Sequence, residues 1–187
     1  MPRTVVGESR NHWFCETCQL PRYQHPMIVV TCFVAWQKSL LLVRRAIEPK
    51  RGCWAIPGGY LEGDESSAAG AVRELREEAG LVIAPEQVSF YTTGSLTFIN
   101  QVYLGYRARV AHPDCTPGRE SLECGFFTRE QCPWDLMAYP EVNYSIEKAY
   151  TDIENNRFPT WHAELTDSRH EHKRVYTGPL PTPPDWR

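Results

Sequence analysis

Residues 59–81 read GYLEGDESSAAGAVRELREEAGL and bring three glutamates, Glu74, Glu77 and Glu78, into five consecutive positions of a predicted helix. At about 100° per residue, the three side chains share one sector of the helix surface. Like charges three or four residues apart repel by roughly a few tenths of a kcal/mol per pair. Two interpretations follow: a solvated acidic face, or a set of oxygen ligands for a hard cation such as Mg²⁺.

The helix itself has clear start and stop signals. It is predicted to run from Glu65 to Ala79, with Asp64 as its N-cap and Gly80 as the glycine that ends it. One stripe of this helix is apolar and is expected to pack against a core; its members are Ala68, Val72, Leu75 and Ala79. The carboxylates therefore lie beside a buried face.

Composition limits the kind of protein to which this helix belongs. The chain has 187 residues, enough for one domain with a buried core, and a hydrophobic content of 42%, which is ordinary for a globular protein. Its net charge of -3 provides no positive field to attract nucleic acid or an anionic membrane. Because we find no apolar run of membrane-spanning length and no secretory signal, a cytoplasmic location is expected. Seven scattered cysteines, an odd number, indicate a reducing compartment rather than a disulfide framework.

Strand and helix patterns are mixed along the rest of the chain, as in an α/β domain. Strands are predicted at residues 27–36, 39–45, 88–92, 101–111 and 123–128. A second amphipathic helix is predicted to begin at Pro140 or Glu141. The expected organisation is an N-terminal segment, one domain and an extended Pro-rich tail, over residues 1–25, 26–156 and 157–187.

The spacing around the glutamates decides between the two interpretations. Gly59, five residues, Glu65, seven residues and then RELREEAGL over 73–81 match the Nudix box, G-x5-E-x7-R-E-U-x-E-E-x-G-U with U apolar, at every specified position. On this resemblance the chain is identified as a member of the Nudix hydrolase family. The resemblance implies the Nudix fold, an α/β/α sandwich with a mixed β-sheet in which the box forms a loop-helix-loop.

The resemblance extends over most of residues 13–155. It is carried by the segments YQHPMIVV, LLVRRAIEPKRGCWAIPGGYLEGDES, INQVYLGYRARV, ESLECGFF and PWDLMAYPEV. These segments are similar to a branch of Nudix enzymes that cleave FAD and ADP-ribose-type dinucleotides and often carry an N-terminal zinc ribbon. The implied reaction is Mg²⁺- or Mn²⁺-dependent attack of water on a nucleoside diphosphate derivative, NDP-X, giving a nucleoside monophosphate and phosphorylated X.

The resemblance also implies roles for residues of the box. The implied metal ligands are the Gly59 carbonyl and the carboxylates of Glu74, Glu77 and Glu78. Glu65 and Arg73 are expected to pair with each other and hold the loop to the helix. The metal ions would neutralise an anionic substrate, which a chain of negative net charge cannot do with its surface alone.

A general base is expected beyond the box, in the loop HPDCTPGRESLECGFF over residues 112–127. Family enzymes that act on dinucleotides often take the base from this part of the chain. Glu120 is the first candidate and Glu123 the second. Because box glutamates also serve as the base in the family, Glu77 is a third candidate.

Substrate contacts are predicted from residue type and position. Arg44 and Arg45 end a predicted strand, where a guanidinium can bind a phosphate with two hydrogen bonds or can be merely solvated. Three aromatic side chains are candidates for stacking on a planar base or, alternatively, for the core: Tyr60, Phe98 and Tyr103.

The N-terminal CETC pair, Cys15 and Cys18, matches one half of a zinc ribbon. A tetrahedral structural zinc site needs four ligands, and no cysteine precedes Cys15. A metal-free, vestigial pair is therefore favoured. The alternatives are zinc completed by His12 and His25, or zinc shared across a dimer.

Three functions compete on this sequence. The favoured one is a pyrophosphohydrolase acting on FAD, ADP-ribose or a similar small-molecule nucleotide. The alternatives are a house-cleaning (d)NTP pyrophosphatase and a non-catalytic Nudix-like nucleotide sensor. The box retains all of its carboxylates, whereas their loss would favour the sensor. The sequence is compatible with a monomer or a homodimer.

Overall fold

The computed structural model describes residues 2–9, 11–140, 143–166 and 173–177. The two helices of this part are α1 (Ser67–Ala79) and α2 (Asn143–Asn155). The strands of the main sheet are β4 (Met27–Trp36), β5 (Ser39–Arg45), β6 (Trp54–Ala55), β7 (Gly58–Tyr60), β8 (Ser89–Leu96), β9 (Gln101–Arg109), β10 (Ser121–Phe127), β11 (Trp161–Leu165) and β12 (Lys173–Thr177). Short 3₁₀ turns occupy Pro85–Gln87, Thr97–Ile99 and Trp134–Leu136.

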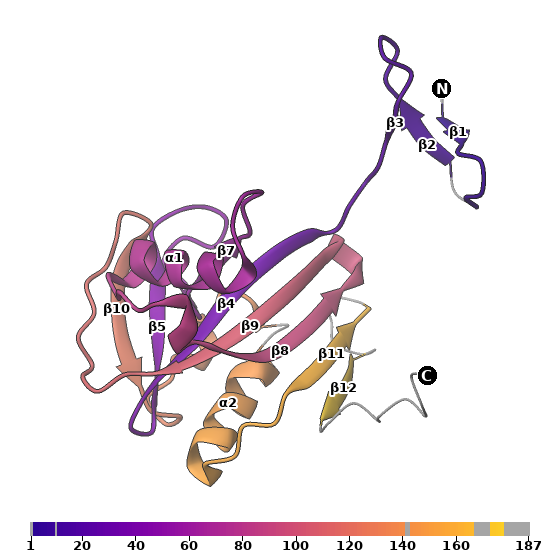
Figure 1. The fold of residues 1–187 in the computed structure, drawn as a ribbon. Helices are drawn as coiled ribbons and strands as arrows, with labels where there is room; N and C mark the ends of the chain where they lie inside the picture. Colours follow the sequence, from indigo (N-terminus) through magenta and orange to yellow (C-terminus); the bar gives the residue numbers. More distant parts are fainter. Residues whose placement is uncertain (1, 10, 141–142, 167–172, 178–187) are drawn as a thin grey trace.

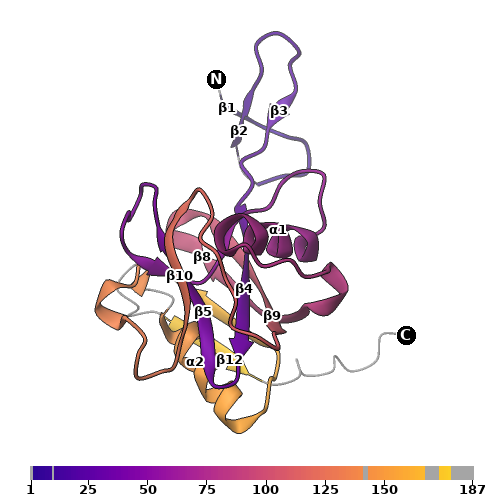
Figure 2. The same cartoon turned by 90° about the vertical axis from the view of Figure 1, so that its left-hand side faces the viewer.

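Over the described residues the main sheet has nine strands, in the order β10-β5-β4-β9-β8-β11-β12, with β6 added to β5 and β7 to β4. The β4–β9 and β8–β11 pairs are parallel and the other pairs are antiparallel, so the sheet is mixed. Helices α1 and α2 cover opposite faces of the sheet (Figures 1 and 2). The molecule is thus the α/β/α sandwich that the sequence predicts.

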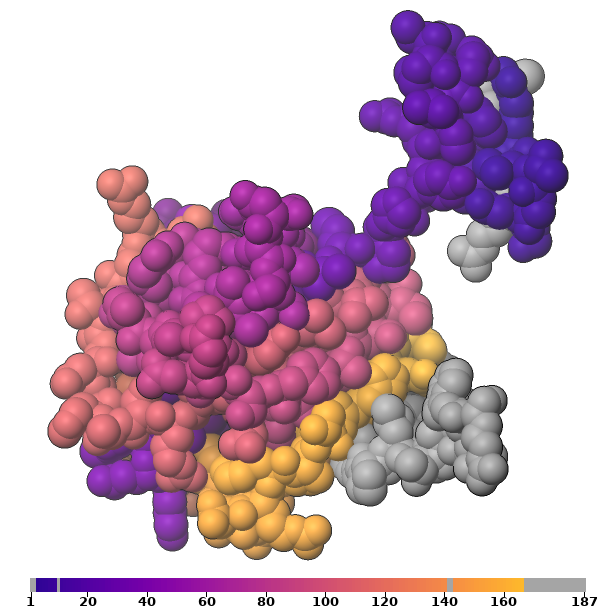
Figure 3. All heavy atoms as spheres, viewed as in Figure 1, coloured from indigo at the N-terminus to yellow at the C-terminus, as the bar shows by residue number. Residues whose placement is uncertain are grey.

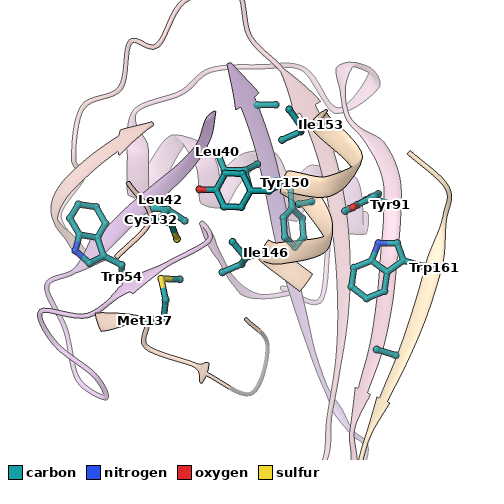
Figure 4. Close-up of a cluster of buried hydrophobic side chains, with 14 of the residues drawn as sticks. Leu40, Leu42, Trp54, Tyr91, Cys132, Met137, Ile146, Tyr150, Ile153 and Trp161 are labelled. Atoms are coloured by element: carbon teal, nitrogen blue, oxygen red, sulfur yellow. The ribbon is translucent and has the colours of Figure 1, made fainter. Parts of the chain in front are cut away.

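The central strands β4 and β5 are buried because both of their faces are covered. Their side chains alternate between two cores, as the period of a strand requires. The core beneath α1 contains Val30, Cys32, Val34, Leu41, Val43, Ala71, Leu75 and Ala79. The core beneath α2 is larger and richer in aromatic residues; Figure 4 labels Leu40, Leu42, Trp54, Tyr91, Cys132, Met137, Ile146, Tyr150, Ile153 and Trp161.

The N-terminal segment forms a small antiparallel sheet of its own. Its strands are β1 (Pro2–Thr4), β2 (Asn11–Phe14) and β3 (Pro21–Arg22). This sheet stands apart from the main body and is joined to it by the chain leading into β4 (Figures 1 and 3). The CETC pair lies in the turn between β2 and β3.

The start of α1 differs from the prediction of Asp64 as its N-cap. The observed cap is Ser66, whose backbone is extended and whose Oγ accepts a hydrogen bond of 3.2 Å from the Ala69 amide. Serine and aspartate are equally good caps, so the sequence did not distinguish them. At the other end Gly80 has φ of 66°, the left-handed conformation predicted for a residue that ends a helix.

The prediction of a tail beginning at residue 157 was wrong for its first part. Strand β11 joins the main sheet parallel to β8, and Trp161, Ala163 and Leu165 are fully buried. Alternation of these three apolar residues with polar ones is a strand signal, which the following proline-rich sequence obscured. The domain boundary at 156 is therefore too early; residues 178–187 lie outside the described part.

Other boundaries shift by a few residues. Strand β8 continues to Leu96, four residues past its predicted end, and β10 begins at Ser121 rather than at Glu123. Positions 141–142, at the predicted start of the second helix, lie outside the described residues. Within the described part of the chain, no helix is long and apolar enough to cross a membrane.

Candidate active site

Glu78, in the last turn of α1, is a nearly buried carboxylate with a relative exposure of 6%. Its Oε2 accepts a hydrogen bond of 2.9 Å from the amide of Gly58, at the start of β7. Burial, together with the charges of Glu74 and Glu120, raises the pKa of Glu78 to about 7, although this hydrogen bond and the charge of Arg45 act in the opposite direction. Glu78 therefore lies where a positive charge would be stabilised.

Glu74 lies one turn before Glu78 on the same face of α1. Its Oε1 accepts a hydrogen bond of 2.7 Å from Nη1 of Arg73. Burial nevertheless raises the pKa of Glu74, and the charges of Glu77 and Glu120 act in the same direction. The two carboxylates of α1 thus share an environment that disfavours their ionised forms in the absence of a cation.

Arg73 is the centre of an ion-pair network at the base of the box. It donates two hydrogen bonds to Glu65, of 2.7 and 3.0 Å, and one of 3.1 Å to the carbonyl of Tyr60. Its Nη1 also contacts Glu77 at 3.1 Å. Arg73 therefore ties the loop at Glu65 and strand β7 to α1, and its hydrogen bond lowers the pKa of Glu65.

Two glycines allow the close approach of backbone segments around these carboxylates. A Cβ on Gly59 would overlap the carboxylate of Glu74, so with glycine there the carboxylate can lie directly against β7, and a larger residue would displace it. A Cβ on Gly118 would overlap the backbone carbonyl of Glu77. Gly118 instead donates a hydrogen bond of 3.1 Å from its amide to the carbonyl of Glu78.

The Gly118 contact positions Glu120, the first candidate for the general base. The backbone carbonyl of Glu120 accepts a hydrogen bond of 2.8 Å from the amide of Ala46, which fixes the loop to the end of β5. The side chain is exposed, and its charge acts on both Glu74 and Glu78. The structure thus brings Glu120 to the box from a distant part of the sequence.

Glu123, the second candidate for the base, lies elsewhere. It belongs to β10, and its Oε2 is 3.5 Å from Nη1 of Arg44. Neither side chain lines the cleft described below, and Nε of Arg44 donates to the carbonyl of Gly52 at 3.0 Å. Neighbouring strand residues point to opposite faces, which explains why Arg45 lines the cleft and Arg44 does not.

A cleft of about 1060 Å³ opens beside the carboxylates of α1. Its charged lining residues are Arg45, Glu48, Glu62, Arg73, Glu74, Glu77, Glu78, Arg119 and Glu120. Its apolar and aromatic lining includes Ile47, Trp54, Ile56, Tyr60, Leu96, Ile99, Tyr103, Met137, Tyr139 and Ile146. One part of the cleft is therefore suited to charge and another to a planar or apolar group.

The three aromatic candidates for stacking occupy different environments. Tyr60 lines the cleft with 54% of its surface exposed, whereas Tyr103 lines it but is nearly buried and shares a hydrogen bond with the hydroxyl of Tyr144. Phe98 packs against the core beneath α2 and does not line the cleft. Only Tyr60 of the three presents a ring with substantial free surface.

Several lining residues were not predicted from the sequence. Tyr139 lies beneath the guanidinium of Arg45, whose Cζ is 5.7 Å from the ring centroid. Gln101 and Arg119 also line the cleft. Neither residue belongs to the Nudix box. Arg119 could have been proposed as a lining residue because it precedes Glu120 in the chain, whereas nothing about the position of Gln101 in the sequence indicates that it lines the cleft.

The box residues fit a hard divalent cation by their chemistry. Glu74, Glu78 and the Gly59 carbonyl provide oxygen ligands, as Mg²⁺ and Mn²⁺ prefer; Glu78 is buried, Glu74 is partly buried, and the pKa of each carboxylate is raised. Among the described residues, no three His, Cys, Asp or Glu side chains already converge as a metal site. Arg73 holds Glu74 and Glu77 in ion pairs, and a cation would compete for them.

The CETC pair provides two thiols in a turn. Hydrogen bonds from the backbone of Cys18 and Thr17 lower the pKa of Cys15 to about 7. His12, one of the proposed additional ligands, is bound to Glu8 at 2.6 Å. Within the described part of the chain no third protein ligand joins the pair, and a metal-free pair stays a prediction.

Comparison with known proteins relates this arrangement to a family. A family model described as NUDIX domain matches residues 25–147. An ADP-ribose pyrophosphatase from Methanocaldococcus jannaschii is 38% identical over 140 residues, which cover 70% of this chain and 74% of that protein. An 8-oxo-dGDP phosphatase from Homo sapiens is 26% identical over 133 residues, which cover 71% of this chain but only 41% of the human protein.

A solved structure indicates the same family as these relatives. The crystal structure of a NUDIX hydrolase from Nitrosomonas europaea resembles this chain with a TM-score of 0.79 and 30% identity, covering 89% of this chain and 94% of that one. Box, fold and relatives agree, and the chain belongs to the Nudix family of hydrolases that act on acid anhydrides.

Proposed function

We propose that this protein is a Mg²⁺-dependent pyrophosphohydrolase that cleaves a nucleoside diphosphate derivative such as ADP-ribose or FAD. The products are a nucleoside monophosphate and a phosphorylated second product. The observation that carries the proposal is the buried, under-compensated Glu78, grouped with Glu74 and Glu120 at the charged part of an aromatic-lined cleft. Mn²⁺ has the same ligand preference and is the alternative ion.

Glu74, Glu78 and the Gly59 carbonyl would hold the ion, with Glu77 beside them. When bound, Mg²⁺ supplies Lewis-acid polarisation of the diphosphate and neutralises its charge. Arg73 and Glu65 keep strand β7 and α1 together, so that Gly59 stays close to Glu74. Arg45, which lines the cleft beside Tyr139, is placed to bind a phosphate oxygen.

Glu120 is proposed as the general base that accepts a proton from the attacking water. It is exposed at the cleft, on a loop fixed to α1 through Gly118. We expect Glu120→Gln to lower kcat by about 10²-fold or more, since a positioned base contributes roughly 10²–10⁴-fold.

Glu123→Gln is the matched control for the base, because Glu123 lies three residues further on and pairs with Arg44 outside the cleft. Its kcat should stay within about threefold of the parent. Steady-state kinetics of both variants at saturating Mg²⁺ make the comparison. A kcat of Glu120→Gln within that same range would transfer the role to Glu77, the remaining candidate that lines the cleft.

A dinucleotide-like substrate is favoured by the shape and lining of the cleft. Its volume is at the upper end of what small-molecule sites offer, and the aromatic rings of Tyr60 and Tyr139 line it beside the charged residues. A relative of this chain is an ADP-ribose pyrophosphatase. Both observations support a substrate with a second planar or apolar moiety beyond the diphosphate.

The deciding experiment is a substrate panel with identified products. ADP-ribose, FAD, NADH, diadenosine polyphosphates and nucleoside triphosphates are each incubated with Mg²⁺ or Mn²⁺ and separated by chromatography. AMP with ribose 5-phosphate, or AMP with FMN, supports the proposal. Release of inorganic pyrophosphate from a triphosphate would instead favour a house-cleaning enzyme; the human relative, an 8-oxo-dGDP phosphatase, is the reason to consider nucleotides without a second moiety. Nucleotide binding without turnover of any of these compounds would indicate a sensor.

A further inference from the structure

Tyr60 and Gln101 lie together at one rim of the cleft. Nε2 of Gln101 donates a hydrogen bond of 3.2 Å to the hydroxyl of Tyr60. The backbone of Tyr60 is fixed in turn, because its carbonyl accepts a hydrogen bond of 3.1 Å from Arg73. The exposed ring of Tyr60 is therefore held at both ends, at its backbone by the ion-pair network of the box and at its hydroxyl by Gln101.

Gln101 projects from a rigid position of the sheet. It is the first residue of β9 and lies between Met27 of β4 and Leu96 of β8 in the strand register. Among the described residues that line the cleft, Gln101 is the only side-chain amide. The polar group beside a second ring of the cleft, the partly buried Tyr139, is the charged guanidinium of Arg45.

The two side chains have complementary chemistry. An exposed aromatic ring stacks on any nucleobase, a contact that is tolerant of base identity. A carboxamide has one acceptor oxygen and two N–H donors, and Tyr60 occupies one of these donors. The remaining acceptor and donor of Gln101 match the amino group of adenine and its neighbouring ring nitrogen.

We propose that Gln101 is a specificity-determining residue that hydrogen-bonds the edge of an adenine base stacked on Tyr60. The inference rests on the proposed function, which supplies a nucleotide to the cleft. Hypoxanthine has a carbonyl oxygen where adenine has its amino group, and this oxygen and the adjacent N7 are both acceptors, so a carboxamide in either orientation can match only one of them. Tyr60 has a second role here, since its hydroxyl shares a hydrogen bond with the carboxamide of Gln101 and holds it at the rim of the cleft.

The test compares kcat/KM for ADP-ribose and for inosine diphosphate ribose, with Mg²⁺ present. We expect the parent protein to favour ADP-ribose by about tenfold or more, because a bidentate contact contributes roughly 1–3 kcal/mol of discrimination. Gln101→Leu should bring the ratio to within about threefold of one. Tyr60→Phe keeps the ring but frees the carboxamide to rotate, so the ratio should fall there too.

Gln24→Leu is the matched control, an exposed glutamine in the segment leading to β4, and should keep the parental ratio. Circular dichroism melting establishes that each variant is folded. A parental ratio near one, or an unchanged ratio in Gln101→Leu, would overturn the inference.

Failure of the proposed function has a different signature, which is no hydrolysis of either substrate by the parent. The affinities of AMP and IMP, measured by calorimetry for the parent and for Gln101→Leu, then decide the inference independently of turnover. The inference is supported if the parent protein binds AMP more tightly than IMP and Gln101→Leu binds the two equally. Equal affinities for AMP and IMP in the parent protein contradict it.

Discussion

Helices α1 and α2 invite comparison because they have the same length and cover opposite faces of one sheet. Each has 13 residues and each buries one carboxylate, Glu78 in α1 and Asp152 in α2, with exposures of 6% and 5%. Burial of a carboxylate costs free energy unless partners compensate for it. The two helices differ in whether the protein itself provides that compensation.

Asp152 is compensated within the protein. The hydroxyl of Tyr91 donates to its Oδ2 at 2.6 Å, and the ammonium of Lys148 lies 3.2 Å from its Oδ1. Glu154, on the same helix, is exposed and pairs with Arg129 at 3.3 Å. The carboxylate of α2 thus has partners for both oxygens and belongs to the aromatic core.

Glu78 is compensated far less. Among the described residues its carboxylate accepts one hydrogen bond, from the amide of Gly58, and the favourable charge of Arg45 is opposed by the negative charges of Glu74 and Glu120. The same kind of group therefore has protein partners for both oxygens on one face of the sheet, whereas on the other it is left to a proton or to the cation proposed above. A buried carboxylate identifies a functional site when its neighbours leave its charge uncompensated.

The largest expected difference between the two carboxylates is in catalysis. Glu78→Gln should lower kcat by about 10³-fold, since it removes a proposed ligand of the metal at the reacting diphosphate. The metal-free variant should melt at or above the parental temperature, because the desolvated charge is gone. Kinetics and thermal melting measure the two effects. Near-parental turnover would remove Glu78 from the metal site.

Asp152→Asn is expected to show the reverse behaviour. It should lower the free energy of unfolding by roughly 1–3 kcal/mol, because Lys148 loses its counter-charge and the bond from Tyr91 is weakened. Its kcat should stay within about threefold of the parent. The exposed Glu154→Gln is the control and should cost no more than about 0.5 kcal/mol. Denaturant unfolding distinguishes the variants; a large loss of kcat in folded Asp152→Asn would mean that the two faces are coupled.

The smallest effect concerns pH and metal binding together. In the metal-free fold the pKa of Glu78 is raised to about 7 from 4.5, so its contribution to stability is present below pH 4.5 and is lost as the pH rises through 7. A cation must displace the proton, and Mg²⁺ should therefore raise the melting temperature by a few degrees more at pH 8 than at pH 6. Scanning calorimetry at both pH values provides the measurement. If Mg²⁺ raised the melting temperature equally at pH 6 and pH 8, or if the pH-dependent difference persisted in Glu78→Gln, Glu78 would not be its cause.

The site was predictable from the sequence wherever its residues are close in the chain. Glu74 and Glu78 are one turn apart, so helix geometry alone places them on one face. The contact of Glu65 with Arg73 spans eight residues across a helix start, and the spacing of the box specifies it. These placements depend on local backbone geometry, which the sequence encodes directly.

Predictions failed where the position depends on pairing between distant segments. Phe98 was a candidate for stacking, yet the turn that carries it directs the ring to the core beneath α2. Gln101 was missed because its role depends on Tyr60, a neighbour 41 residues away in the chain. Strand β11 was missed because its partner β8 lies beyond an intervening helix.

The sequence by itself determined the family, the mixed α/β class and the carboxylates of α1, since each depends on spacing within one element. Only the tertiary structure decided which other groups meet them. It excluded Arg44 and Glu123 from the cleft and brought in Arg45, Glu120 and Gln101. The physical reason is that helix periodicity is a local property, whereas the lining of the cleft depends on sheet register and on the close packing that Gly59 and Gly118 permit.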